Sequence, residues 1–505
     1  MRYVIVAIVS ILAILAAIWK LNSARDGIAI AHERAGSTPV TIFRLASAKP
    51  GPVVVIAHGF AGTQQLMQPF ALTLARNGYV AATFDFRGHG RDPEPLPGSL
   101  TDQNSSLRAL LHQLGDVASF ARPFGDGRLA LLGHSMASDI VVRYAQAHPD
   151  IAATIAVSVF SPGATATSPR NLLIIDGALE PSFLKDEGKR IVGLAAKTPV
   201  EENVTYGNVT QGTARRLVFA GGVEHIGVLY SSDSMAAALD WMDKTFARQG
   251  SGFTDVRGGW LGLLFLGLVA LAWPLSRLLP VVTGVALGYG LPWRRFWPVA
   301  VVPAVLTPLI LWKIPIDFMP LLLGDYLVLH FALYGVLTAV GIVLTRAMRP
   351  KDTVGLQPIS YASLAIGCVA CIAYGVFAVG VPADRFVTNL APLAVRLPLI
   401  AIMFGGTVVY CLADEWLTRG AAAARGGYAF SKLCFLASLA FAIALNPQRL
   451  FFLVIIVPAI LVLFLIYGLF SAWAYRRTNH PLAGALTAAT AFAWAMAVSF
   501  PIVGP

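Results

Sequence analysis

The sequence predicts two joined parts, an α/β domain built on a doubly wound, mostly parallel sheet and an all-α polytopic transmembrane domain. Of the 505 residues, 56% are hydrophobic and 13% are charged, whereas soluble proteins usually have about 25% charged residues. Charged and polar residues are frequent between Asn22 and Arg257 and scarce after Trp260. We therefore expect the α/β domain over residues 21–250 and the membrane domain over residues 258–505.

The first element is an apolar run from Tyr3 to Trp19, flanked by Arg2 and Lys20. Its length is at the lower limit for a helix that crosses a bilayer, and it also fits the apolar region of a secretory signal peptide. The stretch "LAAIWK" places bulky side chains where cleavage would require small ones. We therefore predict an uncleaved signal anchor over residues 1–20, in preference to a cleaved signal peptide.

The α/β prediction depends on short apolar runs that alternate with longer helical patterns from Pro52 onward. Continuous apolar runs of this length are typical of parallel strands that are buried on both faces of a sheet. Most of the intervening segments are long enough for crossover helices. Two earlier runs, "IAIAHER" and "TIFRLA", are expected to add antiparallel strands at one edge. The main runs are "VVVIAH", "YVAATFDF", "RLALLGHS", "IAATIAVSVF", "NLLIIDG" and "RRLVFAGG".

Polar residues follow several of these predicted strands. Ser135 follows "LALLGH", Glu180 lies just after "LLIIDG", and His225 follows "LVFAGG". Reacting groups in doubly wound sheets gather at the carboxyl ends of the strands. A serine hydroxyl is protonated at neutral pH and needs an adjacent base to become a nucleophile. A serine, a carboxylate and a histidine in this order therefore indicate nucleophilic catalysis.

Three stretches resemble motifs of the α/β-hydrolase fold, and the likeness extends over about residues 39–248. "GHSMA" is similar to the G-x-S-x-G nucleophile elbow, with Ala137 in place of the last glycine. "HGFAG", which begins at His58, resembles the oxyanion loop of this family. "DFRGHGRD" is similar to a D-x-R-G-x-G segment in its lipase, esterase and peptidase branches. The resemblance implies a serine hydrolase domain fused to a polytopic membrane domain.

The resemblance also implies roles for individual residues. Ser135 is the expected nucleophile, and His225 is the base that takes its proton and returns it to the leaving group. The acid in this family commonly lies three residues beyond a glycine at a strand end, which selects Glu180; Asp176 is the alternative. The backbone N–H groups of Phe60 and Met136 are the expected oxyanion donors.

No cofactor and no metal ion are expected. His58, His89 and His134 do not have the spacing of a closed ligand set and are predicted to be structural. Cys368 and Cys371 formally match C-x-x-C, but no second pair accompanies them, so we interpret both as small packing residues.

The second part predicts eight further membrane spans, since each apolar run approaches the length of about 20 residues that a bilayer requires. Val281–Trp293 is interpreted as a half-span or an interfacial helix. The eight spans are Trp260–Leu279, Pro298–Trp312, Met319–Leu344, Tyr361–Val381, Leu393–Leu412, Leu433–Leu445, Leu450–Trp473 and Pro481–Phe500.

The orientation follows from the basic residues of the short loops. Nine spans with a cytoplasmic N-terminus place the loops that carry Arg294, Arg349, Arg425 and Arg476 on the cytoplasmic side. The same parity places the α/β domain on the extracytoplasmic, periplasmic side. Because these loops hold much of the net charge of +11, we expect membrane lipids and not nucleic acid as partners.

Three ionisable residues lie in the predicted spans or near their ends. Asp325 and His330 are five positions apart, so they lie on different helix faces, and Arg396 lies near the outer end of a later span. For these groups we favour interhelical hydrogen bonding over a proton or substrate pathway.

The function that we expect is hydrolysis of carboxylic esters, with lipid or other amphipathic esters as substrates, through an acyl-enzyme intermediate. The ten residues from Ser161 to Arg170 leave no room for a large lid, so the segment after Glu180 or the membrane is expected to cover the site. An acyltransferase, a thioesterase or a peptidase with the same triad is the nearest alternative. A transporter or scaffold with a non-catalytic hydrolase-like domain is an alternative of a different class.

Overall fold

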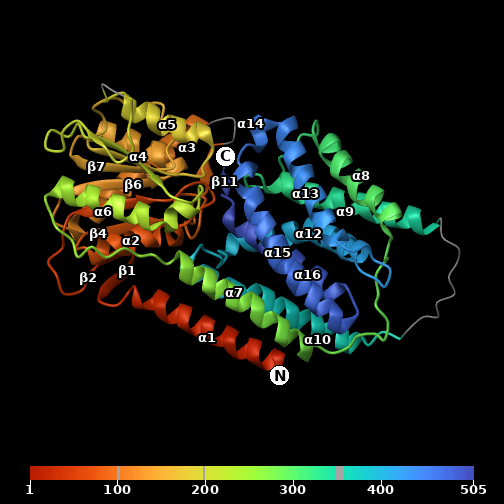
Figure 1. Cartoon of the computed structure of the whole chain (residues 1–505). Coiled ribbons are helices and arrows are strands. Elements are labelled where there is room, and N and C mark those ends of the chain that lie inside the picture. Colours follow the sequence, from red (N-terminus) through yellow and green to blue (C-terminus); the bar gives the residue numbers. More distant parts are fainter. Residues whose placement is uncertain (99–102, 197–198, 348–357, 505) are drawn as a thin grey trace. The chain divides into compact units, whose positions relative to one another are not determined.

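The computed structural model describes residues 1–98, 103–196, 199–347 and 358–504, which form two compact units (Figure 1). The predicted basic-loop residue Arg349 lies outside the described residues. The α/β unit contains Ala16–Leu263 together with Ala383–Ala391 and residues 499–504. The helical unit contains Met1–Leu15, Leu264–Pro382 and Pro392–Val498. Two short stretches from late in the sequence thus belong to the α/β unit.

The α/β unit is built on a sheet of nine strands in the order β1-β2-β4-β3-β6-β7-β8-β10-β9. The strands from β4 to β10 pair in parallel, and β1, β2 and β9 add antiparallel pairs at the two edges. The predicted mostly parallel sheet with an antiparallel edge is confirmed. The strands are β1 Ile28–Ala35, β2 Thr38–Leu45, β3 Val53–Ala57, β4 Val80–Phe84, β6 Leu129–His134, β7 Ile151–Val157, β8 Leu172–Gly177, β9 Thr205–Tyr206 and β10 Arg215–Ala220.

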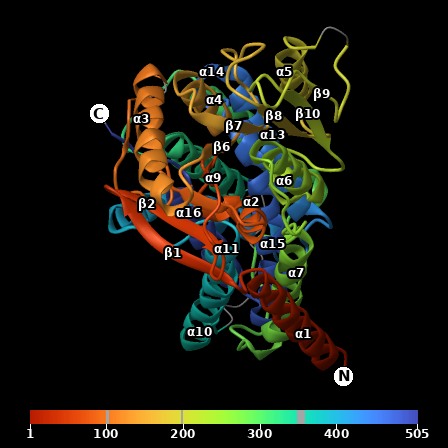
Figure 2. The same ribbon diagram turned by 90° about the vertical axis from the view of Figure 1, so that its left-hand side faces the viewer.

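Helices cover both faces of this sheet (Figures 1 and 2). One face packs against α2 (Gln68–Arg76) and α6 (Ser232–Phe246), and the other packs against α3 (Gln103–Ala121), α4 (Met136–Ala147) and α5 (Ser182–Gly193). Every residue of β3, β4, β6 and β8 is therefore buried. This burial explains why these strands read as continuous apolar runs and not as alternating patterns.

A second, two-stranded sheet joins distant parts of the same unit. Residues 503–504 form β11 (Val503–Gly504), which pairs in parallel with β5 (Leu96–Pro97). Ile502 donates its N–H to the carbonyl of Gly88 at 2.9 Å and accepts from the N–H of Leu96 at 2.9 Å. A Cβ on Gly88 would lie 2.4 Å from the carbonyl oxygen of Ile502, so the approach requires glycine.

Nine helices in the described part of the chain are long and apolar enough to cross a membrane, and they lie where the sequence predicts them. One of them, Tyr361–Phe386, contains a turn of π-helix at Ala373–Ala378 between α10 (Tyr361–Ile372) and α11 (Val379–Phe386). The others are α1 Arg2–Ser23, α7 Gly258–Leu275 with the turn that follows it, α8 Trp293–Leu311, α9 Gly324–Ala347, α12 Leu397–Thr418, α13 Gly427–Leu445, α15 Leu453–Thr478 and α16 Leu482–Ser499; a short helix, α14 Pro447–Leu450, precedes α15.

The prediction of a half-span or interfacial helix over Val281–Trp293 is wrong. Residues 279–292 contain no helix, and α8 begins at Trp293. The backbone of this segment bonds instead to the ends of other helices: Val282 and Leu287 donate to the carbonyls of Thr478 and Asn479. The glycines and prolines of the segment favour this irregular path over a helix.

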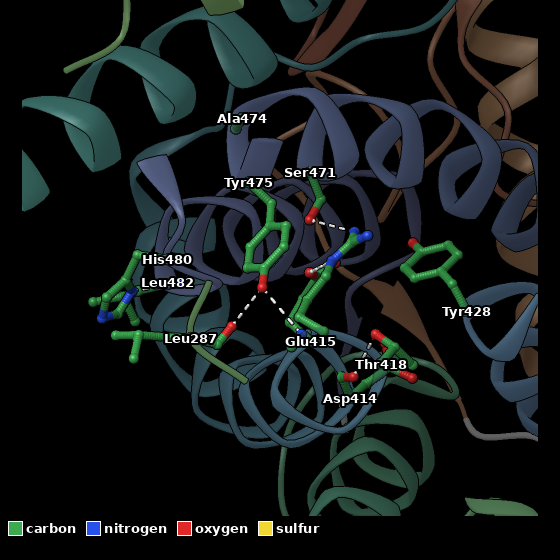
Figure 3. A network of polar contacts seen from close by, with 12 residues as sticks. Leu287, Asp414, Glu415, Thr418, Tyr428, Ser471, Ala474, Tyr475, His480 and Leu482 are labelled. Atoms are coloured by element: carbon green, nitrogen blue, oxygen red, sulfur yellow. Dashed lines mark hydrogen bonds and ion pairs between the residues drawn. The ribbon is translucent and has the colours of Figure 1, made fainter. Parts of the chain in front are cut away.

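A buried polar network lies beside this segment in the helical unit (Figure 3). Arg419 donates to Oε2 of Glu415 at 2.8 Å and to Oγ of Ser471 at 3.0 Å. The hydroxyl of Tyr475 donates to the carbonyl of Leu287 at 2.7 Å. Ionisable groups among apolar helices are costly unless paired, and here each charged member has a partner.

The three ionisable residues singled out from the sequence make interhelical or terminal contacts. His330 lies 3.1 Å from Oγ of Ser438 on α13, and Arg396 donates to the carbonyl of Ala497 on α16 at 2.7 Å. Asp325 lies 3.9 Å from Arg449. These contacts agree with the bonding role that we favoured over a pathway.

Candidate active site

Ser135 lies at a sharp turn between β6 and α4. Its backbone has φ 54° and ψ −117°, a conformation that residues other than glycine rarely adopt. The N–H of Ser135 donates to the carbonyl of Val157 at 2.8 Å, and a Cβ on Gly133 would lie 2.4 Å from the carbonyl of Ala137. The strained backbone and the close approach at Gly133 are the features expected of a nucleophile elbow.

The structure brings His225 to this serine. The hydroxyl of Ser135 donates to Nε2 of His225 at 2.9 Å, although 90 positions separate the two residues. His225 lies in the turn after β10, and its carbonyl accepts a hydrogen bond from Nε2 of His134 at 3.0 Å. His134 therefore holds the backbone of the base, a role beyond the general structural one predicted for it.

Burial, together with the neighbouring His225, keeps the pKa of His134 well below its usual value. His134 consequently stays neutral, and its donation to a carbonyl places its proton on Nε2. The neutral ring of His134 therefore adds no positive charge that would repel a charged ring at position 225.

Glu180 lies on the other side of the His225 ring. Its Oε2 is 3.7 Å from Nδ1 of His225, and its side chain is fully buried. Its Oε1 accepts from the hydroxyl of Ser158 at 2.5 Å and from the N–H of Gly177 at 3.2 Å. These bonds fix one oxygen and leave the other directed at the imidazole. Catalytic hydrogen bonds are often long without substrate, so the 3.7 Å separation is compatible with an orienting acid.

Asp176, the alternative acid, has a different environment. Its Oδ1 accepts from the N–H of Val159 at 3.0 Å, and a Cβ on Gly188 would lie 2.5 Å from its Oδ2. Burial raises the pKa of Asp176 well above its usual value, so it favours the neutral form. The geometry therefore favours Glu180 over Asp176 as the partner of His225.

The loop that begins at His58 lies against the nucleophile. A Cβ on Gly59 would lie 2.9 Å from Cβ of Ser135, which leaves room only for glycine. Nδ1 of His58 donates to the carbonyl of Gly59 at 2.8 Å, while its Nε2 accepts from the N–H of Phe86 at 3.0 Å. Because a trans peptide directs its C=O and N–H oppositely, this bond to Gly59 also sets the direction of the Phe60 N–H.

Met136, the second expected oxyanion donor, is the first residue of α4. The first N–H groups of a helix have no acceptor within the helix and are available to an anion. Phe60 and Met136 thus flank Gly59 and Ser135 along two segments that the structure brings together. The roles of both as oxyanion donors stay a prediction.

Two polar residues in the site were not singled out from the sequence. Ser158 bonds the acid and has a φ of 54°, and its only local signal is its place just after a strand. Asp85 accepts from the backbone N–H of Gln64 at 2.8 Å and from the N–H of Arg91 at 3.0 Å. Asp85 is the first residue of "DFRGHGRD", so the motif contained a signal for it although its contacts did not follow from the motif.

Comparison with known proteins concerns the part of the chain that contains Ser135. Residues 48–175 match the family model described as serine aminopeptidase, S33. The α/β unit has the α/β-hydrolase fold. The family match and the fold identify this unit as a hydrolase domain, and we call it the hydrolase unit from here on.

Solved structures similar to this chain cover less than half of it. TT1662 from Thermus thermophilus is 14% identical, with a TM-score of 0.34, and the match covers 44% of this chain and 99% of that one. A predicted CIB-like hydrolase from Thermoplasma acidophilum is 18% identical, with a TM-score of 0.33, over 43% of this chain and 99% of that one. No curated protein matches the sequence.

Proposed function

We propose that the protein is a membrane-embedded serine hydrolase that cleaves carboxylic esters, with lipid or other acyl-chain esters as substrates. The observation that carries this proposal is the 2.9 Å hydrogen bond between Ser135, held in a strained turn, and His225. Glu180 behind the imidazole and the close approach of Gly59 to the serine support the same chemistry.

In the proposed mechanism, Ser135 Oγ attacks the ester carbonyl while His225 takes its proton. Glu180 holds the imidazole in the tautomer that accepts this proton and stabilises the imidazolium that results. The N–H groups of Phe60 and Met136 stabilise the oxyanion of the tetrahedral intermediate. His225 then protonates the leaving alcohol, and a water activated by His225 hydrolyses the acyl-enzyme.

The choice of a lipid or acyl-chain ester is supported by apolar side chains beside the triad. Leu179 precedes Glu180 and is 66% exposed, and Ile226 follows His225 and is 37% exposed. Phe160, which follows the Ser158 turn, and Phe183, in the first turn of α5, are 54% and 50% exposed. We define these four residues as the apolar rim. Exposed apolar groups gathered at a site favour an apolar ligand.

The proposal includes an extracytoplasmic, periplasmic hydrolase unit, and this side of the membrane rests on the basic residues of the short loops. If the chain crosses the membrane once at each candidate span, the connection after Tyr361–Phe386 lies on the same side as residues 24–257. The residues after α16 lie on that side too. These same three stretches belong to the hydrolase unit. Their common side and their common unit both support this number of spans between them.

The proposal is tested by labelling the full-length protein with a fluorophosphonate probe, beside a Ser135→Ala variant. We expect labelling of the parent only, together with faster hydrolysis of long-chain than of acetyl p-nitrophenyl esters in mixed micelles. Lack of Ser135-dependent labelling would refute the catalytic assignment. Preference for aminoacyl anilides over esters would instead favour a peptidase, the activity that the matching family model describes.

A further inference from the structure

The segment Ala383–Ala391 contains the last four residues of the candidate span Tyr361–Phe386 and most of the connection to the next one, Ala394–Thr418, yet it belongs to the hydrolase unit. Its contacts within that unit are specific hydrogen bonds. Asp384 accepts from the N–H groups of Leu390 and Ala391 at 2.8 and 2.9 Å, and Asn389 donates through Nδ2 to the carbonyl of Ala391 at 3.1 Å. The segment therefore has a defined conformation of its own.

The first attachment of this segment is at the end of the oxyanion loop. The backbone N–H of Asn389 donates to Oγ1 of Thr63 at 3.1 Å, and the hydroxyl of Thr388 lies 3.3 Å from the same oxygen. Thr63 and Asn389 are both completely buried, so water cannot replace these bonds. Thr63 is three residues after Phe60, the expected oxyanion donor.

The second attachment passes through Arg91. Its Nε donates to Oδ1 of Asn389 at 2.8 Å, and its Nη2 pairs with Asp384 at 3.0 Å. The backbone N–H of Arg91 donates to Asp85, which also accepts from the N–H of Gln64. Because Gln64 follows Thr63 in the chain, the hydrogen bonds form a closed ring through Asp85, Arg91, Asn389 and Thr63.

We propose that Asn389 is a positioning residue for the oxyanion loop and that it acts through Thr63 and Arg91. The inference rests on the proposed function. The ring holds the loop at both Thr63 and Gln64, while His58 holds it at Gly59. The oxyanion donor at Phe60 lies between these two fixed points. A connection between two membrane spans thus controls how well the hydrolase unit stabilises its transition state.

The test compares Thr63→Val with Thr63→Ser in the full-length protein. Valine removes the hydroxyl that accepts from Asn389, whereas serine retains it. We expect Thr63→Val and Asn389→Ala to lower kcat for p-nitrophenyl acetate by about ten-fold with little change in KM. This loss is smaller than the roughly hundred-fold effect of removing an oxyanion donor outright. Thr63→Ser restores the rate to near that of the parent.

The matched control is Arg385→Ala. Arg385 lies in the same segment but donates to Asn22 at 2.7 Å, outside the ring. We expect its kcat to equal that of the parent. The end-point yield of fluorophosphonate labelling measures the fraction of folded sites, so Thr63→Val should label more slowly but to the same yield as the parent.

An unchanged labelling rate in Thr63→Val, or a lowered yield that accounts for its slower turnover, would overturn this inference and leave the proposed function intact. An equal loss in Arg385→Ala would also overturn it, since the effect would then be general to the segment. Absence of Ser135-dependent labelling in the parent would overturn the proposed function and this inference with it.

Discussion

Oε2 of Glu180 lies 3.7 Å from Nδ1 of His225, on the opposite side of the imidazole from Ser135. The same carboxylate is anchored through its other oxygen by Ser158 and Gly177. One oxygen is therefore held by the sheet while the second orients the base.

Replacing the acid should separate the two candidates. Glu180→Gln should lower kcat by about 10³- to 10⁴-fold, because an amide donor next to Nδ1 stabilises the wrong imidazole tautomer. Asp176→Asn should keep activity within a few-fold, since burial already favours the neutral form of Asp176. Steady-state ester hydrolysis by both variants measures this, and a greater loss in Asp176→Asn would reverse the assignment.

Adding one methyl group at Gly59 should impair catalysis. The new Cβ would lie 2.9 Å from Cβ of Ser135 and 3.1 Å from the carbonyl of His134, so the oxyanion loop or the serine must move. We expect Gly59→Ala to label with fluorophosphonate about 10²-fold more slowly, comparable to the loss of an oxyanion donor. Gly163→Ala is the control, because its new Cβ would lie 3.8 Å from Oε1 of Gln146, an ordinary van der Waals distance. Equal rates for both variants would contradict the expected crowding.

His134 should make stability depend on pH. Its pKa is held well below 6.5 in the folded protein, so below about pH 6.5 the unfolded chain binds a proton that the folded one does not. The stabilising contribution of His134 is therefore present above pH 6.5 and is lost as the pH falls. The free energy of unfolding of the parent relative to His134→Gln should decrease by about 1 kcal/mol between pH 6.5 and 5.5, because the unfolded histidine is already half protonated at pH 6.5.

The measurement is urea unfolding in detergent, followed by tryptophan fluorescence at both pH values. Glutamine does not titrate, so the difference between the two proteins isolates the histidine. A difference that stays constant or grows as the pH falls would show that His134 is protonated in the folded protein.

The apolar rim should determine the preference for acyl-chain length. Leu179→Ser should lower kcat/KM for a long-chain p-nitrophenyl ester several-fold and leave the acetate ester nearly unchanged. Val204→Ser is the matched control, since Val204 is 38% exposed but lies beside β9, near the amino end of β10. If the two variants lose activity on long chains equally, the rim does not bind the acyl chain.

Close helix packing in the helical unit can be tested at two adjacent glycines of α12. A Cβ on Gly406 would lie 2.4 Å from the carbonyl of Val328 on α9, whereas a Cβ on Gly405 would meet nothing within 4 Å. Gly406→Ala should lower the stability by about 1–3 kcal/mol through overpacking. Gly405→Ala should be neutral or slightly stabilising, because alanine favours helices. Thermal unfolding in detergent compares them, and equal melting temperatures would contradict the close approach.

The sequence predicted those features that leave a local pattern. Continuous apolar runs identified the parallel strands, and runs of span length identified the helices, because burial on all sides imposes composition directly. The positions after the strand ends gave the candidates Ser135, Glu180 and His225, and the structure brings these three residues together.

Contacts between distant segments could not be predicted in the same way. Thr63 and Asn389 are 326 positions apart, and neither carries a motif that names the other. The two-residue strands β5 and β11 are too short to show a periodic pattern. Ser158 likewise reaches Glu180 only because its backbone turns with a positive φ, and the local sequence does not specify this turn.

The hydrolase unit is assembled from three stretches of chain, the last of which, residues 499–504, follows α16. Chains fold progressively from the N-terminus as they are synthesised. The sheet can therefore form early, but the loop that contains Gly88 and Arg91 gains its last partners only after α16 has been made. Biosynthesis thus orders maturation, so that the hydrolase unit is completed only after α16 has been translated.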